Sequence, residues 1–174
     1  KMNIDAITMA TPLDSLKTQL GLNKAIDEVM GQPVFGLVSG KGWEWVSLAY
    51  LIGGLWLIQR RVIAWQIPLG MLTSLTLFSA VCYGIDSSYF AAPVFHLFGG
   101  ATMLGAFFIA TDPVTASTTP RGRLVYGAMI GVLVYIIRVW GGYPDAVAFA
   151  VLLMNLAAPT VDYYTRPRVF GEQS

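Results

Sequence analysis

A carboxylate and two hydroxyl residues lie close together near the start of the chain, at Asp5, Thr8 and Thr11. Pro12 follows Thr11 directly, and apolar residues recur at helical spacing from there until Gly21. Threonine followed by proline is typical of a helix start, because the threonine oxygen accepts a hydrogen bond from a backbone N–H that has no partner within the helix. We therefore predict that Thr11 caps a helix that begins at Pro12 and ends at Gly21.

Residues 5–11, written Asp-x-x-Thr-x-Ala-Thr, resemble the flavin-attachment motif of membrane subunits in the Rnf and Nqr redox pumps. In those subunits the last threonine of the motif carries FMN through a phosphoester on its hydroxyl oxygen. The family pattern usually has glycine where this chain has Ala6 and Met9. The resemblance implies that Thr11 is the covalent FMN anchor. The other residues that it assigns to the cofactor-binding motif are Asp5, Thr8 and Ala10.

The two interpretations of Thr11, as a helix cap and as a flavin anchor, are physically compatible. A phosphate on Thr11 would lie at the amino end of the helix, where free N–H groups and the positive end of the helix dipole stabilise an anion. The phosphate oxygens could also accept the hydrogen bonds that the threonine oxygen accepts as a cap. One residue could therefore serve both purposes.

The composition of the chain indicates a membrane protein. Of its 174 residues, 55% are apolar and 12% are charged, whereas soluble domains have about a quarter charged residues. The formal net charge of +1 gives no reason to expect a nucleic-acid partner. The single cysteine, Cys82, lies in an apolar run and can form neither a disulfide framework nor an iron–sulfur site within this chain. We predict no metal site and no independent catalytic residues.

Five apolar segments follow a more polar start, and they predict an all-α membrane protein with about five transmembrane helices. The segments are residues 43–58, 64–85, 91–111, 124–140 and 146–163. The first is short for a bilayer, which takes about 20 helical residues. We expect residues 1–42 to form a flavin-attachment segment with two short helices, residues 43–164 to form the helix bundle, and residues 165–174 to form a tail.

The distribution of basic residues predicts the orientation of the bundle. Six arginines fall on one side of a five-span arrangement, and Arg138 falls on the other. The six are Arg60, Arg61, Arg121, Arg123, Arg166 and Arg168. The positive-inside rule then places the carboxyl terminus in the cytoplasm and residues 1–42 on the periplasmic side. A flavin on Thr11 would be separated from the cytoplasm by about 30 Å of hydrocarbon.

Polar residues within the apolar segments are candidates for function. Pro93 and the pair Gly99–Gly100 loosen the third segment, which indicates a helix broken near the middle of the membrane. His96 lies in the same segment, and we expect a hydrogen bond to a neighbouring helix more than a metal-ligand or proton-relay role. Arg138, near the end of the fourth segment, is expected to extend its side chain to the membrane interface.

Two further patterns in the apolar segments predict contacts between helices. Gly127 and Gly131, four residues apart, allow another helix to approach closely. Asn155 in the fifth segment is expected to form a hydrogen bond with a neighbouring helix.

A second stretch, residues 107–117, is similar to an aromatic-then-Ala-Thr-Asp-Pro-Val signature of the same subunits. Without the resemblance, Asp112–Pro113 indicates a helix end and a turn. With both motifs, the similarity covers nearly the whole chain and is closer to the D-type membrane component of Rnf complexes than to the B-type component of Nqr. It implies that this chain is the carboxyl-terminal half of a ten-helix subunit made of two five-helix halves in an inverted or duplicated arrangement.

The resemblance implies a membrane subunit of an ion-translocating electron transport complex of the ferredoxin:NAD oxidoreductase type. Such a subunit is part of a translocase in the bacterial inner membrane and not an independent enzyme. Its covalent FMN would exchange electrons with other subunits, including an outer-face FMN subunit, and relatives also contain riboflavin as a second flavin. The alternative is a cofactor-free channel or permease for a small solute, which broken, glycine-rich helices also suit. A purely structural assembly subunit is a third possibility.

Overall fold

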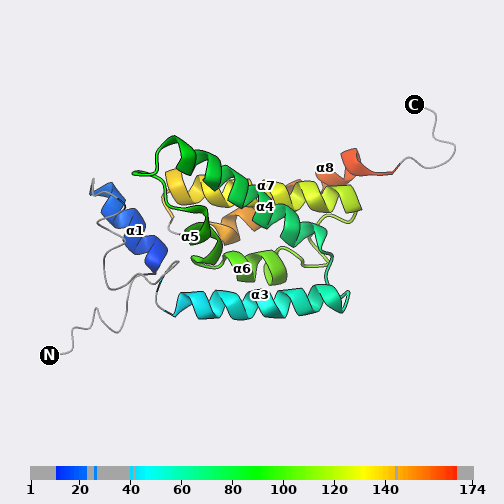
Figure 1. The fold of residues 1–174 in the computed structure, drawn as a ribbon. Helices are drawn as coiled ribbons and strands as arrows, with labels where there is room; N and C mark the ends of the chain where they lie inside the picture. The colour runs from blue at the N-terminus through cyan, green and yellow to red at the C-terminus, as the bar shows by residue number, and fades with distance from the viewer. Residues whose placement is uncertain (1–10, 23–25, 27–39, 41, 144, 168–174) are drawn as a thin grey trace.

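The computed structural model describes residues 11–22, 26, 40, 42–143 and 145–167. Every element among these residues is helical, in agreement with the predicted all-α membrane fold (Figure 1). The elements are α1 (Pro12–Gly21), α3 (Trp43–Gln59), α4 (Gln66–Ile85), α5 (Pro93–Phe98), α6 (Thr102–Leu104), the π-helical turn η2 (Gly105–Ile109), α7 (Pro120–Trp140) and α8 (Val147–Thr165). The second short helix expected near residues 24–30 lies outside the described residues, apart from Ile26.

Three of the described helices, α4, α7 and α8, are long and apolar enough to cross a membrane. The first predicted segment forms α3, which has only 17 residues. The third predicted segment is divided among α5, α6 and η2. All five apolar segments are therefore helical, but two of them are not single helices of full membrane-spanning length.

The break in the third segment occurs at the glycine pair, as the sequence predicted. α5 ends at Phe98, and Gly99 has an extended backbone with φ −84° and ψ 138°. Gly100 has a φ of +61°, which is in the left-handed region that glycine adopts at little cost. The chain therefore changes direction at Gly99–Gly100 before α6 and η2 continue to Ile109.

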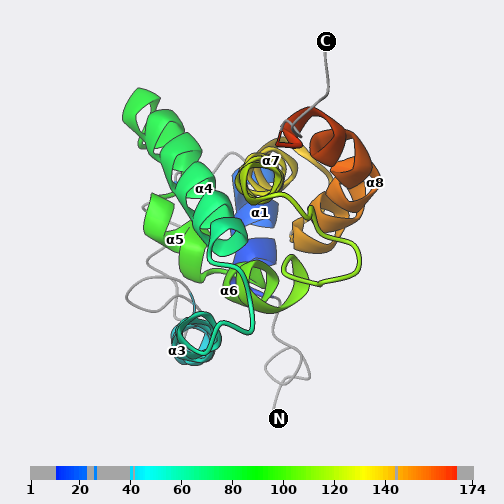
Figure 2. The same ribbon diagram turned by 90° about the vertical axis from the view of Figure 1, so that its right-hand side faces the viewer.

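The bundle is built around α4, α7 and α8, with α6 and η2 on one side (Figure 2). Its largest fully buried side chains include Met71, Leu75, Tyr126, Ile130 and Tyr135. α3 lies at the periphery and has only Ser47 and Gly54 buried. α1 lies at one end of the bundle, where its residues Leu13 and Leu16 share a second apolar cluster with Phe95.

The close contact between α4 and α7 depends on glycines in both helices, as Gly127 and Gly131 predicted. A Cβ atom on Gly127 would collide with the carbonyl oxygen of Ile67, and one on Gly131 would collide with that of Met71. On the α4 side, a Cβ atom on Gly70 would lie 2.7 Å from the carbonyl oxygen of Leu124. The two backbones therefore touch where the side chains are absent.

Gly131→Ala is expected to lower the thermal stability of the protein, because the new methyl group must push α7 away from the α4 backbone. Gly84→Ala in α4 is the matched control, since a Cβ atom there would meet nothing within 4 Å. Alanine is favoured over glycine in a helix by up to about 1 kcal/mol, so the control should be neutral or stabilising. Thermal unfolding followed by circular dichroism tests the pair. Equal midpoints for the two variants would contradict the close packing.

The arginine-bearing connections gather at the end of the bundle opposite α1. The α3–α4 turn, the start of α7 and the end of α8 lie at the right in Figure 1, whereas α1 lies at the left. At that right-hand end, Arg61 and Arg123 line one cavity, and the hydroxyls of Thr119 and Thr165 are 2.5 Å apart. This arrangement agrees with the grouping of basic residues from which the orientation was predicted.

Candidate functional site

Thr11 caps α1 as the sequence predicted. Its hydroxyl oxygen accepts a hydrogen bond from the backbone N–H of Asp14 at 3.3 Å, and its carbonyl accepts one from Ser15 at 2.9 Å. The residue is exposed, so the hydroxyl lies at an accessible helix amino end. The other members of the proposed attachment motif, Asp5, Thr8 and Ala10, lie outside the described residues.

A cavity of about 350 Å³ lies beside Thr11. Trp43 and Tyr50 of α3 line it, together with Gly100 at the helix break and Asp145. Its wall is mostly apolar and includes two aromatic rings, which suits a flat aromatic molecule with a polar edge. The hydroxyl of Thr11, at the amino end of α1, therefore adjoins a mostly apolar space with two aromatic side chains in its wall.

Arg138 does not extend to the membrane interface, so this prediction was wrong. Its side chain is 1% exposed, and its guanidinium turns inward to the helix break. Nη1 donates to the carbonyl oxygen of His96 at 2.7 Å, and Nη2 donates to that of Gly99 at 3.2 Å. A broken helix leaves carbonyl groups without helical partners. The cation is therefore held by these carbonyls, which lie in a distant segment of the sequence.

Asp145 completes this network from the connection between α7 and α8. Its Oδ1 atom forms an ion pair with Nη2 of Arg138 at 3.0 Å. Its Oδ2 atom accepts a hydrogen bond from the N–H of Ala101 at 2.8 Å. Burial alone would raise the pKa of Asp145, but the Arg138 guanidinium and the Ala101 amide outweigh this effect and hold the pKa below its usual value. Asp145 thus joins the two sides of the helix break, and it does so as a carboxylate.

Two hydroxyl groups also donate to carbonyl oxygens at the break. The hydroxyl of Thr102 donates to the carbonyl oxygen of His96 at 2.8 Å, and that of Ser47 in α3 donates to Phe98 at 2.9 Å. A buried carbonyl without a partner is costly. The break is therefore stabilised by side chains from several elements.

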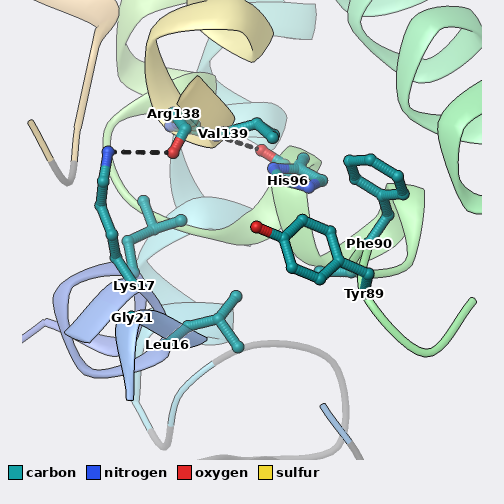
Figure 3. Close-up of a pocket in the computed structure, with 10 residues that line it drawn as sticks. Leu16, Lys17, Gly21, Tyr89, Phe90, His96, Arg138 and Val139 are labelled. Atoms are coloured by element: carbon teal, nitrogen blue, oxygen red, sulfur yellow. Dashed lines mark hydrogen bonds between the residues drawn. The ribbon is translucent and has the colours of Figure 1, made fainter. Parts of the chain in front are cut away.

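Lys17 fixes α1 to the end of α7. Its ammonium donates to the carbonyl oxygen of Arg138 at 3.2 Å (Figure 3). It also donates to the carbonyl oxygen of Tyr143 at 3.0 Å and to that of Gly141. A cation at the carboxyl end of a helix is favoured, because the last carbonyls have no helical partners and carry the negative end of the dipole. The helix that bears Thr11 is thus held at a defined position on the bundle.

The sequence profile that describes the NQR2, RnfD and RnfE proteins matches residues 1–171. The chain belongs to the NQR2, RnfD, RnfE family. Proteins named as the D subunit of an ion-translocating oxidoreductase complex are similar to it. The one from Vibrio atlanticus (strain LGP32) is 60% identical over 171 residues, which are 98% of this chain and 49% of the relative. The one from Yersinia pseudotuberculosis serotype O:1b (strain IP 31758) is 56% identical over 175 residues, which are 100% of this chain and 50% of the relative.

A third similar protein with the same name, from Escherichia fergusonii, is 55% identical over 174 residues. These residues are 99% of this chain and 49% of that relative. The chain therefore spans about half the length of the curated relatives it matches.

The second stretch that linked the sequence to the NQR2, RnfD, RnfE family forms a helix end and a turn, as predicted. A carboxylate oxygen of Asp112 accepts from both the N–H and the hydroxyl of Thr115, at 3.0 and 2.7 Å. The hydroxyl of Thr111 donates to the carbonyl oxygen of Phe107 at 2.7 Å. In the described part of the chain, these residues shape the turn after η2.

Of the hydrogen bonds predicted for the two other polar residues within the apolar segments, one is present and one is absent among the described residues. Asn155 of α8 accepts a hydrogen bond from the hydroxyl of Tyr126 in α7, which confirms the predicted link between helices. His96 is buried, but neither of its ring nitrogens has a hydrogen-bond partner among the described residues. The predicted hydrogen bond to a neighbouring helix is therefore absent from that part of the chain. The ring lies edge-to-face with that of Tyr135, with the ring centroids 5.0 Å apart.

Sequence reasoning did not assign roles to Lys17 and Asp145. An acidic residue seven positions after Arg138, across a short turn, was an available signal for the ion pair. No such signal existed for Lys17, whose carbonyl partners lie more than 120 residues away in sequence. Among the described residues, no group of three or more His, Cys, Asp or Glu side chains could hold a metal ion.

Proposed function

We propose that this chain is part of a membrane subunit of a redox-driven, ion-translocating complex, and that it carries electrons through FMN attached to Thr11 by a phosphoester. The observation that carries this proposal is the position of Thr11, an exposed hydroxyl at the amino end of α1 beside a cavity lined by aromatic rings. Membership of the NQR2, RnfD, RnfE family supports it. So does the similarity to proteins named as the D subunit of an ion-translocating oxidoreductase complex.

Each part of the site has a physical role toward the flavin. The amino end of α1 stabilises the phosphate, because its free N–H groups and dipole favour an anion. Trp43 and Tyr50 offer faces against which a flat ring can pack. FMN, when bound, supplies one-electron chemistry that no amino-acid side chain of the site provides. Lys17 holds α1 so that the cofactor is kept at one position on the bundle.

The proposed setting is the bacterial inner membrane, with the end that carries α1 on the periplasmic side and the arginine-rich end in the cytoplasm. This follows from the positive-inside rule applied to arginines that share one end of the bundle. The flavin would then exchange electrons with other subunits of the complex, including an FMN-bearing subunit at the outer face. A riboflavin in the same assembly is a further cofactor that we expect.

The orientation can be tested with single cysteines in a Cys82→Ala background. Thr18→Cys in α1 should react with a membrane-impermeant maleimide in intact cells whose outer membrane has been permeabilised, because Thr18 is exposed. Arg121→Cys, exposed at the start of α7, should react only after the inner membrane is disrupted. The reverse labelling pattern would show that the bundle has the opposite orientation.

The flavin proposal is tested with the intact complex on a denaturing gel. Under blue light, the band of this subunit should fluoresce, because an ester-linked flavin stays with the unfolded polypeptide. Mass spectrometry of the peptide that contains Thr11 should show the added mass of FMN on that residue. A dark band and an unmodified peptide from freshly isolated complex would favour the cofactor-free channel or permease instead.

A further inference from the structure

The cavity that Arg61 and Arg123 line lies at the end of the bundle opposite α1 (Figure 1). It has a volume of about 530 Å³ and is enclosed by the α3–α4 turn, the turn after η2 and the start of α7. Two helices that are long and apolar enough to cross a membrane, α4 and α7, begin beside it. The cavity is therefore at the level where the hydrocarbon of a bilayer meets the head groups.

Charges of both signs line this cavity without pairing with each other. Arg61, Arg123 and Asp112 are part of its wall, and none of the three forms an ion pair with another described residue. Nε of Arg123 donates to the carbonyl oxygen of Ser117 at 3.2 Å, which holds the guanidinium near the wall. The hydrogen bonds that Asp112 accepts from Thr115 both go to Oδ2, so Oδ1 has no partner among the described residues. The wall therefore offers two cations and one anion to a ligand.

The backbone of Arg61 also distinguishes this position. Its φ of +58° is in the left-handed region, and no other described residue except glycine has a positive φ. Glycine adopts this conformation at little cost, whereas other residues in it often mark functional sites. An arginine in this turn is thus consistent with a function of its guanidinium that offsets the backbone cost.

The apolar part of the wall continues into an exposed apolar surface. Val62 and Trp65 line the cavity and are also exposed. Leu69 of α4 lies four residues after Trp65, on the same side of the chain, and is exposed as well. Tryptophan is typical of the interface between hydrocarbon and water. A ligand with a charged head in the cavity can therefore extend apolar chains along α4.

We propose that this cavity binds the head group of phosphatidylethanolamine, a phospholipid that carries both a phosphate and a primary ammonium. The phosphate lies between Arg61 and Arg123, because guanidinium groups bind phosphate oxygens well. The ammonium donates a hydrogen bond to Oδ1 of Asp112, and the acyl chains extend along α4 past Trp65. Basic pockets between membrane helices are suited to phospholipid head groups. This inference does not depend on the flavin at Thr11.

Other phosphate compounds fit the charges of the wall less well. Phosphatidylglycerol has the same phosphate but no cation for Asp112. Phosphatidylcholine has a cation, but its quaternary nitrogen has no N–H to donate to the carboxylate. Inorganic phosphate has neither the ammonium nor the apolar chains. The preference among these compounds therefore tests the proposal.

The bound lipid can be identified by photo-crosslinking in the intact complex. We suggest reconstituting the complex in vesicles with equal amounts of phosphatidylethanolamine, phosphatidylglycerol and phosphatidylcholine. Trp65→p-benzoylphenylalanine places the photoreactive group in the cavity wall, and mass spectrometry of the cross-linked peptide gives the mass of the attached lipid. Tyr164→p-benzoylphenylalanine is the control, because Tyr164 is exposed near the end of α8, at the same end of the bundle, and does not line the cavity.

Phosphatidylethanolamine should be enriched over each of the other two lipids at position 65, relative to position 164. The expected enrichment is about fivefold, which one partly exposed ion pair can give. Asp112→Asn should remove this preference, because asparagine has no charge but keeps an oxygen that can accept from Thr115. Asp86→Asn is the matched control, since Asp86 does not line the cavity, and it should keep the preference of the parent.

Arg61→Gln should lower the yield of all lipid adducts at position 65 severalfold, because the phosphate loses one of its two cations. Arg121→Gln should not, since Arg121 is exposed at the start of α7 and does not line the cavity. An excess of inorganic phosphate should leave the adducts unchanged. The proposal is overturned if the three lipids are captured in equal proportions at both positions, or if another lipid is enriched at position 65. Retention of the preference in Asp112→Asn, equal yields for the two arginine variants, or displacement of the lipid by inorganic phosphate would also overturn it.

Discussion

Thr11→Val is expected to remove all covalent flavin fluorescence from the protein band on a denaturing gel, while the helices stay folded. Valine has nearly the same shape as threonine but lacks the oxygen to which the phosphate would be joined. The substitution also removes the hydrogen bond that Thr11 accepts from the N–H of Asp14. Loss of a helix cap costs about 1 kcal/mol, which is small compared with the stability of a folded bundle. Circular dichroism should therefore remain close to that of the parent protein.

Thr18→Val is the matched control for this experiment. Thr18 is exposed on the same helix but lies inside it and does not cap its amino end. This variant should keep the full fluorescence of the parent. Thr11→Ser adds a second comparison, because serine keeps a hydroxyl at the cap position and should retain the helix start. If the Thr11→Val band stayed as bright as the parent band, the phosphoester would have to be on another residue.

Asp145→Asn is expected to destabilise the protein strongly, because the charge of Arg138 would remain buried without its counter-ion. Removing one partner of a buried ion pair costs about 3–5 kcal/mol. The side chain of Asp145 is 33% exposed, so solvent screening favours the lower end of this range. Asparagine also weakens the contact with the N–H of Ala101 that joins the helix break to the start of α8. Thermal unfolding in detergent should show a midpoint several degrees lower.

The same ion pair should make stability depend on acid pH. The pKa of Asp145 is lower in the folded protein than in the unfolded chain. The contribution of Asp145 to the free energy of unfolding is therefore complete above the pKa of about 3.9 for a free aspartate. The contribution is lost as the pH falls through the lower, folded value, because the carboxyl group must then be protonated. Asp145→Asn should lack this part of the acid dependence.

Asp86→Asn is the control for both measurements. Asp86 is exposed after α4, and its side chain accepts a hydrogen bond from the N–H of Ser88 at 2.9 Å. This substitution should change the stability by less than about 1 kcal/mol, as is usual for surface positions away from special contacts. Equal unfolding midpoints for Asp86→Asn and Asp145→Asn would show that the pair with Arg138 does not stabilise the bundle.

Features that depend on neighbouring residues in the sequence were predicted correctly. Thr11 followed by Pro12 defined the start of α1, because a cap and a first helical residue are chosen by local hydrogen bonding. Gly99–Gly100 predicted the break in the third segment, since few other residues adopt a positive φ cheaply. The apolar composition predicted the all-α membrane class, because the backbone in hydrocarbon must satisfy its own hydrogen bonds.

Features that depend on distant partners were decided by the tertiary structure. The sequence alone suggested an interfacial position for Arg138, but the free carbonyls of a segment some 40 residues earlier hold it inside the bundle. Tertiary packing also brings Lys17 to the end of α7, although the two are far apart in the sequence. It likewise creates the two cavities at opposite ends of the bundle. Local patterns show which groups need a partner, but the packing of the helices determines which partner lies within reach.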